Sequence, residues 1–324
     1  MSVLSFVEVA EGKIKKASWE AAYYASQVAT KLGVVAEAVV LGEADTAELS
    51  SLGAYGITKV HHVADVRLNV FDSKAFTKAV CAVAESTGAR AIVLSFNQNG
   101  KLLGPRISVR LKAGLVPGAS ELPAVVGDWQ VRKNVFSGKA TATYKVNTPV
   151  AVFSVNPNSV TPVKGSGTAE VVSAAVSLSD ADFSIRIVRT DKVKGTVPLT
   201  EAERVISGGR GLKGPENWGM IEELANELGA ATACSRAVSD VDWRPHHEHV
   251  GQTGLTIRPN LYIAAGISGA IQHLAGVNGS KVIVVVNTDP EAPFFKAADY
   301  GVVGDAFEVI PKLTEEIRKL RANG

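Results

Sequence analysis

Short apolar stretches alternate with segments of helical periodicity through the first third of the chain. The expected strands are 3–9, 34–41, 59–63 and 91–95, and the expected helices are 18–32, 46–52, 73–87 and 104–113. The first of these helices has Ser18 at its start and small residues such as Ala21 and Ala25 along one face, which suits close packing on a sheet. The alternation predicts an α/β domain with a mostly parallel sheet.

The pattern changes in the middle of the chain. Residues 125–143 alternate apolar and polar side chains and predict an antiparallel hairpin insert, and 149–156 predict one more strand. Residues 157–184 are rich in Ser, Thr, Gly and Ala without a helical period, which indicates a weakly packed connection, and the extended basic segment 185–197 follows it. We therefore expect a boundary near residue 190, with an N-terminal domain at 1–190 and a C-terminal domain at 191–324.

The second half repeats the strand–turn–helix order around glycines. Strands are expected at 204–208, before 234, at 261–265, at 282–286 and at 306–310, and helices at 215–228, after a capping Ser268, and at 311–321. Pro215 at the first helical position and Gly229 just past the end favour those helix limits. This half therefore predicts a Rossmann-like, doubly wound domain.

Composition narrows the class of protein. The 324 residues are 46% hydrophobic, and 34 basic residues nearly balance 32 acidic ones, so the charge does not indicate a nucleic-acid or anionic membrane surface. Cys81 and Cys234 lie in apolar patterns without disulfide or metal spacing, which favours a cytoplasmic location. No signal peptide and no apolar stretch of about 18 residues is recognisable, so we expect a soluble protein that is neither exported nor imported.

A candidate ligand site follows the strand 261–265. Gly266 and Gly269 allow a sharp turn and close approach of a ligand, and the free N–H groups at the start of the next helix attract an anion such as phosphate. Gln272 and His273 lie about one turn into that helix. Asn287 ends the next strand at the same carboxyl edge, where open α/β sheets bind ligands. The residues alone leave nucleotide binding and an ordinary connecting turn equally open.

The turn after strand 204–208 narrows the choice of cofactor. Its Gly-Gly-Arg-Gly sequence is not the dinucleotide fingerprint, and the following strand ends at Ser235 and Arg236 rather than at an acidic residue, so a nicotinamide cofactor bound in the usual way is disfavoured. Arg236 at the end of a strand is placed to meet a ligand, although a solvated arginine is the simpler interpretation. Asp305 is either a contact for adenine or ribose or a turn residue.

Three histidines and a glutamate, His246, His247, Glu248 and His249, stand close together in the chain. Their spacing is too tight for a zinc site on one element, because neighbouring side chains diverge. We expect a polar surface loop and no metal site.

Two segments resemble the alpha subunit of electron-transfer flavoprotein. The segment 261–287 carries the family's C-terminal signature at Tyr262, Gly266, Ser268, Gly269, Gln272, His273, Gly276 and Asn287. Val-Gly-Gln-Thr-Gly at 250–254 is a second motif of the family. The matches to the family run from about residue 204 to residue 310. This chain departs from the family in having Val285 where a small alanine is usual, Leu255 where a lysine is common, and additional histidines at 246–249.

The resemblance implies one FAD at the carboxyl edge of the C-terminal sheet. The implied cofactor-binding residues are Arg210, Ser235, Arg236, Val250, Gly251, Gln252, Thr253, Ser268, Gly269, Ala270, Ile271, Gln272, His273, Asn287, Asp305 and Ala306. In the family, the arginine matching Arg236 favours the reduced, anionic forms of the flavin through its fixed charge. The residue matching Thr253 hydrogen-bonds the ring nitrogen N5, and those matching Asp305 and Ala306 contact the adenosine end.

The implied function is that of an electron carrier. The resemblance predicts a heterodimer with a beta subunit that binds AMP or a second FAD and packs against the N-terminal domain. Single electrons would pass from flavin dehydrogenases, such as the acyl-CoA dehydrogenases of fatty acid β-oxidation, to a membrane quinone oxidoreductase. No catalytic residue is expected, because no nucleophile and base are paired on one predicted edge. A flavin- or nicotinamide-dependent oxidoreductase with its own substrate and a non-redox nucleotide-binding module stay open as alternatives.

Overall fold

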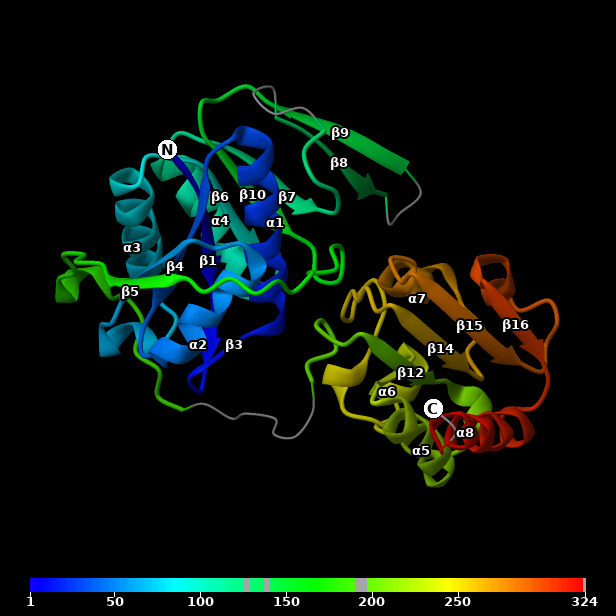
Figure 1. Ribbon diagram of the computed structural model, residues 1–324. Coiled ribbons are helices and arrows are strands. Elements are labelled where there is room, and N and C mark those ends of the chain that lie inside the picture. The colour runs from blue at the N-terminus through cyan, green and yellow to red at the C-terminus, as the bar shows by residue number, and fades with distance from the viewer. Residues whose placement is uncertain (125–128, 137–139, 190–196, 323–324) are drawn as a thin grey trace. The chain divides into compact units, whose positions relative to one another are not determined.

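The computed structural model of the chain describes residues 1–124, 129–136, 140–189 and 197–322 (Figure 1). The chain divides into two compact units. Unit 1 comprises residues 1–134 and 141–192, and unit 2 comprises 135–140 and 193–324. The boundary expected at residue 190 lies outside the described residues. Both units have a parallel α/β sheet, and the predicted α/β class is confirmed.

Unit 1 is built on a seven-stranded sheet in the order β11-β5-β4-β1-β6-β10-β7, and each of its strand pairs is parallel. The strands are β1 (Ser2–Val7), β4 (Val35–Leu41), β5 (Lys59–Val63), β6 (Ala89–Ser95), β7 (Gly114–Ala119), β10 (Ala151–Val155) and β11 (Glu170–Ser173). Two separate pairs are β2 (Val9–Ala10) with β3 (Lys13–Ile14), and β8 (Trp129–Val135) with β9 (Ala140–Val146), where the hairpin insert was expected.

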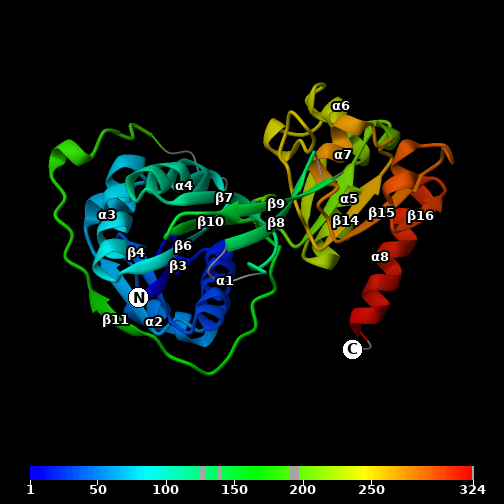
Figure 2. The same cartoon turned by 90° about the horizontal axis from the view of Figure 1, so that it is seen from above.

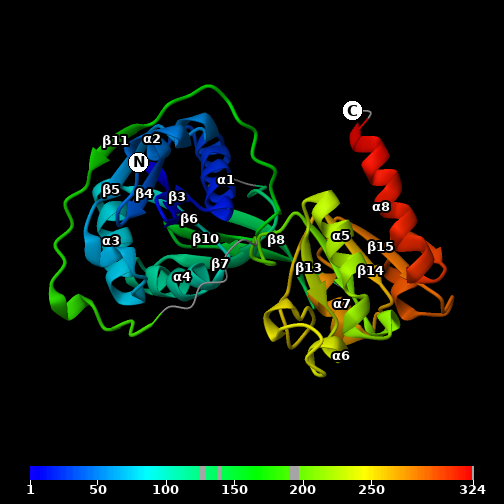
Figure 3. The same cartoon turned by 90° about the horizontal axis from the view of Figure 1, so that it is seen from below.

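Helices cover both faces of this sheet (Figure 2 and Figure 3). They are α1 (Lys16–Leu32), α2 (Thr46–Ser50), α3 (Ser73–Ser86) and α4 (Gln98–Arg110), with the 3-10 turns η1 (Ser51–Tyr55), η2 (Val66–Asn69) and η3 (Asp180–Asp182). Alternate residues of β6 show the division. Ala91 and Val93 pack in the core that contains α1, whereas Ile92 and Leu94 pack in the core that contains α3 and α4. The two-residue period of the strands thus supplies two buried faces.

Two predicted helix starts in unit 1 are wrong, and one strand was not predicted. Helix α1 begins at Lys16, and Ser18 does not cap it, because its hydroxyl accepts a hydrogen bond from the Glu8 amide at 2.9 Å. Helix α4 begins at Gln98 rather than at 104, because Asn97 caps it by accepting from the Gly100 amide at 2.9 Å. Strand β7 was missed, because its two glycines and Pro117 indicate a turn by composition.

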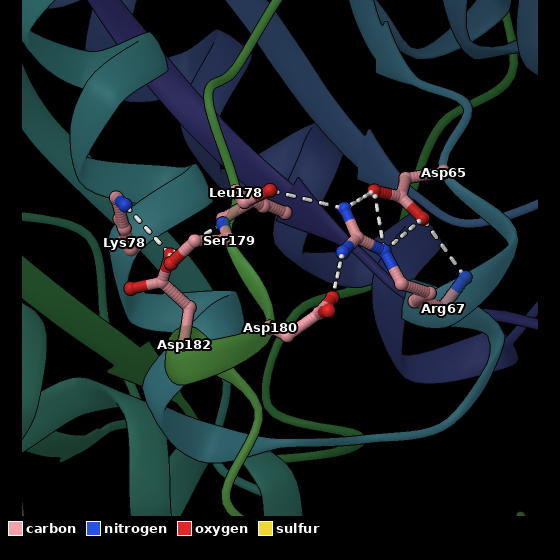
Figure 4. A network of polar contacts seen from close by, with 7 residues as sticks. All are labelled: Asp65, Arg67, Lys78, Leu178, Ser179, Asp180 and Asp182. Carbon is pink, nitrogen blue, oxygen red and sulfur yellow. Dashed lines mark hydrogen bonds and ion pairs between the residues drawn. The ribbon is translucent and has the colours of Figure 1, made fainter.

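The segment 157–184 is also more ordered than its composition predicts. It supplies β11, which extends the sheet by parallel pairing with β5. Residues 178–185, which we call the strap, are then fastened to η2 and α3 (Figure 4). Arg67 binds Asp180 at 3.0 Å and the Leu178 carbonyl at 3.1 Å, and Lys78 binds Asp182 at 2.7 Å. Backbone pairing, ion pairs and apolar side chains such as Leu178 and Phe183, which pack against the core of unit 1, together hold this part of the chain.

Unit 2 is a five-stranded parallel sheet in the order β13-β12-β14-β15-β16 (Figure 1). The strands are β12 (Arg204–Gly208), β13 (Ala231–Cys234), β14 (Leu261–Ala265), β15 (Val282–Asn287) and β16 (Tyr300–Val303). The helices are α5 (Gly219–Leu228), α6 (Arg236–Ser239), α7 (Ile271–Val277) and α8 (Ala306–Ala322), and the 3-10 turns are η4 (Arg210–Leu212), η5 (Pro215–Asn217), η6 (His246–Glu248) and η7 (Pro293–Ala297).

The predicted doubly wound arrangement of unit 2 is confirmed. Ile206 and Ile263 pack with α5 and α8 on one face, whereas Val205 and Tyr262 pack on the other face, where α7 contributes Val277. Helix α5 ends at Leu228, just before Gly229 with its left-handed φ of 58°, as the sequence predicts, but it begins at Gly219 rather than at Pro215, which begins the 3-10 turn η5.

The predicted strand 306–310 is wrong, because these residues form the first turns of α8. Asp305 caps this helix, since its carboxylate accepts from the Phe307 amide at 3.0 Å. Ala306 and Ile310 are buried four positions apart, which is a helical spacing. Pro311 therefore lies inside the helix and does not begin it.

Candidate functional site

The carboxyl ends of the five parallel strands of unit 2 meet along one edge, which we call the rim. Neighbouring strand ends and loops are joined by backbone hydrogen bonds. Ser235 N donates to Gly208 O at 3.1 Å, Gly209 N to Ala265 O at 2.9 Å, Gly266 N to Val286 O at 2.9 Å, and Gly304 N to Asn287 O at 2.9 Å. The rim is thus one connected surface from β13 to β16.

The strand order reverses at the junction of β12 and β14, where an open parallel sheet leaves a crevice for a ligand. Three glycines meet at this junction. A Cβ on Gly209 would lie 2.2 Å from the Gly266 carbonyl oxygen, and one on Gly211 would lie 2.7 Å from the Gly266 Cα. Gly266 itself has a φ of 63°. Only glycines allow the two loops to approach this closely, and they leave backbone accessible to a ligand.

The loop 250–254 is held against both β13 and α7. Val250 N donates to Cys234 O at 3.1 Å, and Gln252 N donates to Gln272 O at 2.7 Å. Gly276 is required where α7 meets the loop, because a Cβ there would lie 2.4 Å from the Gly251 nitrogen. The side chains of Gln252 and Thr253 are exposed.

The rim presents cations to solvent. Arg210 on η4 and Arg236 at the start of α6 are exposed, and Arg236 donates from Nε to Asp240 at 3.1 Å. Lys213, which sequence reasoning missed, has its Nζ 3.9 Å from Asp305 Oδ2 and 4.7 Å from the centre of the Phe307 ring. Its position three residues after Arg210 in the same glycine-rich turn is the signal that could have identified it.

The turn after β14 differs from the expected one. Ser268 does not cap α7, because the helix begins only at Ile271 and its N-cap position is Ala270, which makes no side-chain cap. Ser268, Ala270, Ile271 and Gln272 are all exposed along the rim. Gly269 has a φ of 77° and packs against Phe294, where a Cβ would lie 2.4 Å from that of the phenylalanine.

The side chains of Asn287 and Asp305 form hydrogen bonds within unit 2. The Asn287 amide donates to the Ile267 carbonyl at 3.0 Å and accepts from the Asp289 amide at 3.0 Å, which fixes the turn after β15. Asp305 uses Oδ1 as the cap of α8, and its Oδ2 faces Lys213. The interpretation of Asp305 as a turn residue is therefore correct, and a contact with a ligand would be an additional role.

His273 is buried beneath the rim. The Tyr262 hydroxyl lies 2.8 Å from its Nε2. Burial, with a smaller effect from the nearby His249, lowers the pKa of His273 to about 4, and the Val250 backbone opposes the shift. Burial likewise raises the pKa of the Tyr262 hydroxyl. At neutral pH the pair is therefore uncharged.

The sixteen predicted site residues all lie in unit 2, and eight of them are exposed. Ser235, Asn287 and Asp305 are half-buried, and Val250, Gly251, Gly269, His273 and Ala306 are buried. The assignment of all sixteen to cofactor binding stays a prediction.

The histidine-rich loop is divided between surface and interior. His246 and His247 are exposed, Glu248 is paired with Arg244 at 2.7 Å, and His249 is buried. Among the described residues, no group of three or more His, Cys, Asp or Glu side chains is arranged to hold a metal ion.

Both cysteines are free and buried. Burial raises the pKa of the Cys81 thiol to about 11 and that of Cys234 to about 12, so both stay protonated at neutral pH. In the part of the chain that the structure describes, no helix combines the length and apolarity needed to cross a membrane.

A separate cavity of about 770 Å³ lies in unit 1, beside the carboxyl ends of β1 and β4. Its buried Glu8 is satisfied, because Lys15, Asn97 and Asn99 all donate to its carboxylate. None of the predicted site residues lines this cavity.

Comparison with known proteins identifies the family. The model of the "Electron transfer flavoprotein domain" matches residues 3–179, and that of the "Electron transfer flavoprotein FAD-binding domain" matches 198–278. Electron transfer flavoprotein alpha subunits from Bacillus subtilis, Syntrophomonas wolfei and Mycobacterium leprae are 36%, 37% and 38% identical to this chain. The matches cover 98%, 97% and 97% of this chain, respectively, and 98% of each relative. The chain therefore belongs to the electron transfer flavoprotein alpha-subunit family, whose members are electron carriers rather than enzymes with a substrate of their own.

Proposed function

We propose that the rim of unit 2 binds one FAD and that the chain is the flavin-bearing alpha subunit of a heterodimeric electron carrier. The observation that carries the proposal is the position of the sixteen predicted residues along the rim, within and beside the segment that the FAD-binding family model matches. A flavin would supply one-electron redox chemistry there.

The residues of the rim fit an anionic dinucleotide with an aromatic ring. The glycines at the β12–β14 junction leave a cradle that side chains would fill, and the exposed Arg210 and Arg236 provide fixed positive charge. In the proposal, Arg210 and Ser268 hold the phosphates, and Gln272 offers a donor to the ring system. Asp305 and Ala306 contact the adenosine end.

The remaining predicted residues serve the ring system. Thr253 and Gln252, on the loop fastened to α7, donate hydrogen bonds to the ring. His273 supplies a neutral imidazole below it, and Asn287 fixes the turn that borders it. Arg236 provides a permanent charge that favours electron uptake.

The partners are proposed from the family. A beta subunit that binds AMP or a second FAD completes the heterodimer and contacts the N-terminal domain at 1–190, whereas the domain at 191–324 holds the flavin. Flavin dehydrogenases, such as the acyl-CoA dehydrogenases of fatty acid β-oxidation, donate single electrons, and a membrane quinone oxidoreductase accepts them. The complex is proposed to work in the cytoplasm. The names of the relatives, which specify an alpha subunit, support a second subunit.

Co-purification tests this function. We expect the full chain, co-expressed with its beta subunit, to retain a yellow cofactor that mass spectrometry identifies as FAD. The expected amount is one FAD per alpha chain, not counting any flavin bound to the beta subunit. Arg210→Ala should weaken FAD retention by roughly tenfold, because a phosphate loses a charge-assisted hydrogen bond. A colourless complex, or one that retains only a nicotinamide or adenine nucleotide, would contradict the proposal.

Substitution of Arg236 tests its electrostatic role. Arg236→Ala should keep FAD but lower the potential for the first electron by an equivalent of about 1 kcal/mol, because one fixed charge beside the ring is lost in a partly solvated position. Asp240→Asn is the matched variant, since it removes the carboxylate that pairs with Arg236 and should shift the potential in the opposite direction. Potentiometric titration measures both. Equal potentials in the three proteins would eliminate this role.

A further inference from the structure

The additional histidines of this chain lead from the surface of unit 2 to the buried His273. His246 is exposed, and its Nδ1 lies 3.1 Å from the Ser239 hydroxyl. Its ring centre is 5.4 Å from that of His249, which is only 2% exposed. His273 follows on α7, hydrogen-bonded to Tyr262. His246 thus belongs to η6, His249 follows η6 directly, and His273 belongs to α7. The imidazoles of His249 and His273 are buried.

The loop 250–254 encloses the His249 imidazole. A Cβ on Gly254 would lie 2.8 Å from His249 Nδ1. A Cβ on Gly251 would lie 3.4 Å from His249 Nε2 and 3.6 Å from the Cα of His273. Gly251 therefore lies between the two buried histidines. The loop that presents Gln252 and Thr253 at the rim is shaped around this side chain.

The imidazole of His249 has an unused nitrogen. Its Nδ1 is buried, and no residue that the structure describes forms a hydrogen bond with it. A buried polar atom without a partner is costly, which points to a second state of the site in which this atom is used. In a neutral imidazole one ring nitrogen donates and the other accepts, and protonation makes both nitrogens donors.

The charged and titratable groups around His249 and His273 are few. Helix α6 contributes Arg236, and Asp240 follows it directly. The turn η6 contributes His246 and Glu248, which pairs with Arg244, β13 contributes Cys234, and β14 contributes Tyr262. Burial lowers the pKa of His249, His246 and Arg236 lower it further, and Asp240 opposes them. His249 disfavours a charge on His273, and burial disfavours a charge on either side chain, so both are neutral at neutral pH.

We propose that His246, His249 and His273 form a proton path, and that the buried pair takes up one proton from solvent when the cofactor at the rim gains negative charge. The inference rests on the proposed function. One electron from the donor protein enters the cofactor, and one proton from water forms an N–H bond on His249 or His273. No bond to the cofactor forms or breaks, and the net charge of the site is unchanged.

A titration without cofactor gives the first test. The full chain with its beta subunit, freed of flavin and labelled with 15N at its six histidines, is titrated by NMR. His249→Gln should raise the pKa of His273, because a neighbouring charge that opposes its protonation is gone. His247→Gln, at an exposed position of the same loop, should leave it unchanged. A His273 titration that is identical in wild type and His249→Gln overturns the proposal, whether or not the protein binds FAD.

The cofactor-loaded complex gives the second test. Over the range in which the pair takes up its proton, the first-electron potential should fall by about 59 mV per pH unit, since one proton accompanies one electron. His249→Gln should flatten this slope, and His247→Gln should follow the wild type. Equal slopes in all three overturn the proposal. If the His249→Gln protein does not accumulate, the surface variant His246→Gln is used in its place. It should raise the pKa of His249, and an unchanged pKa would overturn the proposed proton path.

A wild-type complex that contains no FAD would contradict the proposed function. The titration without cofactor would still decide whether the protonation of His249 and that of His273 are coupled.

Discussion

Replacement of Gly209 by alanine should destabilise unit 2 by about 3 kcal/mol and abolish most cofactor retention. The new Cβ would lie 2.2 Å from the Gly266 carbonyl oxygen and 2.7 Å from Ile267 Cγ1, and backbone cannot move aside as a flexible side chain can. Separation of the two loops would also break the hydrogen bonds from Gly209 to Ala265 and from Gly211 to Gly266. Urea denaturation measures the stability, and flavin absorbance measures retention.

Gly219→Ala provides the control for this substitution. Gly219 begins α5 in the same unit, and a Cβ there meets no atom within 4 Å. Alanine is also the better helix former, so this variant should be at least as stable as the wild type. Wild-type stability in Gly209→Ala would show that the junction of β12 and β14 is looser than its distances indicate.

Loss of the Asp72 carboxylate should destabilise unit 1 by about 3 kcal/mol. One oxygen caps α3 by accepting from Lys74 N at 2.8 Å and Ala75 N at 3.2 Å, and the other accepts from Ser184 N at 2.7 Å and Ile185 N at 3.0 Å. Asp72→Ala removes the cap and leaves the strap's amide groups without their partner. Denaturant unfolding measures the loss, and faster proteolysis within 178–185 would locate it.

The pH dependence of this effect has a definite sign. Burial of the Asp72 carboxyl favours its protonated form, but the hydrogen bonds from Ser184, Lys74 and Ala75 outweigh burial and lower its pKa. The stabilisation is therefore complete above the unfolded-state pKa of about 3.9 and is lost as pH falls through the folded-state value. Wild type and Asp72→Ala should converge in acid.

Asp45→Ala separates the cap from the strap. Asp45 caps α2 by accepting from Ala47 N at 2.8 Å but is exposed, so its loss should cost only about 1 kcal/mol. An equal cost at both positions would mean that the bonds to Ser184 and Ile185 contribute nothing to stability.

Much of the fold was predictable from local pattern. The β-branched run at 282–286 and the small-residue face of the helix with Ala21 and Ala25 have periods that only one element satisfies, and the structure confirms both. The errors in the predicted helix and strand limits occur where a single side chain caps a helix, because composition does not reveal that hydrogen bond. Asn97 begins α4 early by capping it, and Asp305 converts an apolar segment expected to be a strand into the start of α8.

Long-range pairing explains the other differences. The four-residue strand β11 forms only because the edge of β5 is available to it, and neither its length nor its composition predicts that pairing. At the rim, the motifs indicated which loops would gather, because parallel strands place their carboxyl ends together. The pattern gave no sign that His249 is buried within the loop 250–254 or that Lys213 faces Asp305.

The continuous hydrogen bonding along the rim limits how this half of the chain can vary in length. An inserted residue after β12, β14 or β15 would shift an amide that the adjoining loop needs, so its cost would spread to loops distant in sequence. The amino-terminal ends of β12, β14 and β15 are linked in a similar way, because Leu261 N donates to Glu203 O at 3.1 Å and Val282 N donates to Asn260 O at 3.1 Å. Affinity tags or reporter domains therefore belong in a turn such as the one at Gly229, where Gly229 N and Ala230 N bond to carbonyls at the end of α5 and a Cβ on Gly229 would meet no atom within 4 Å.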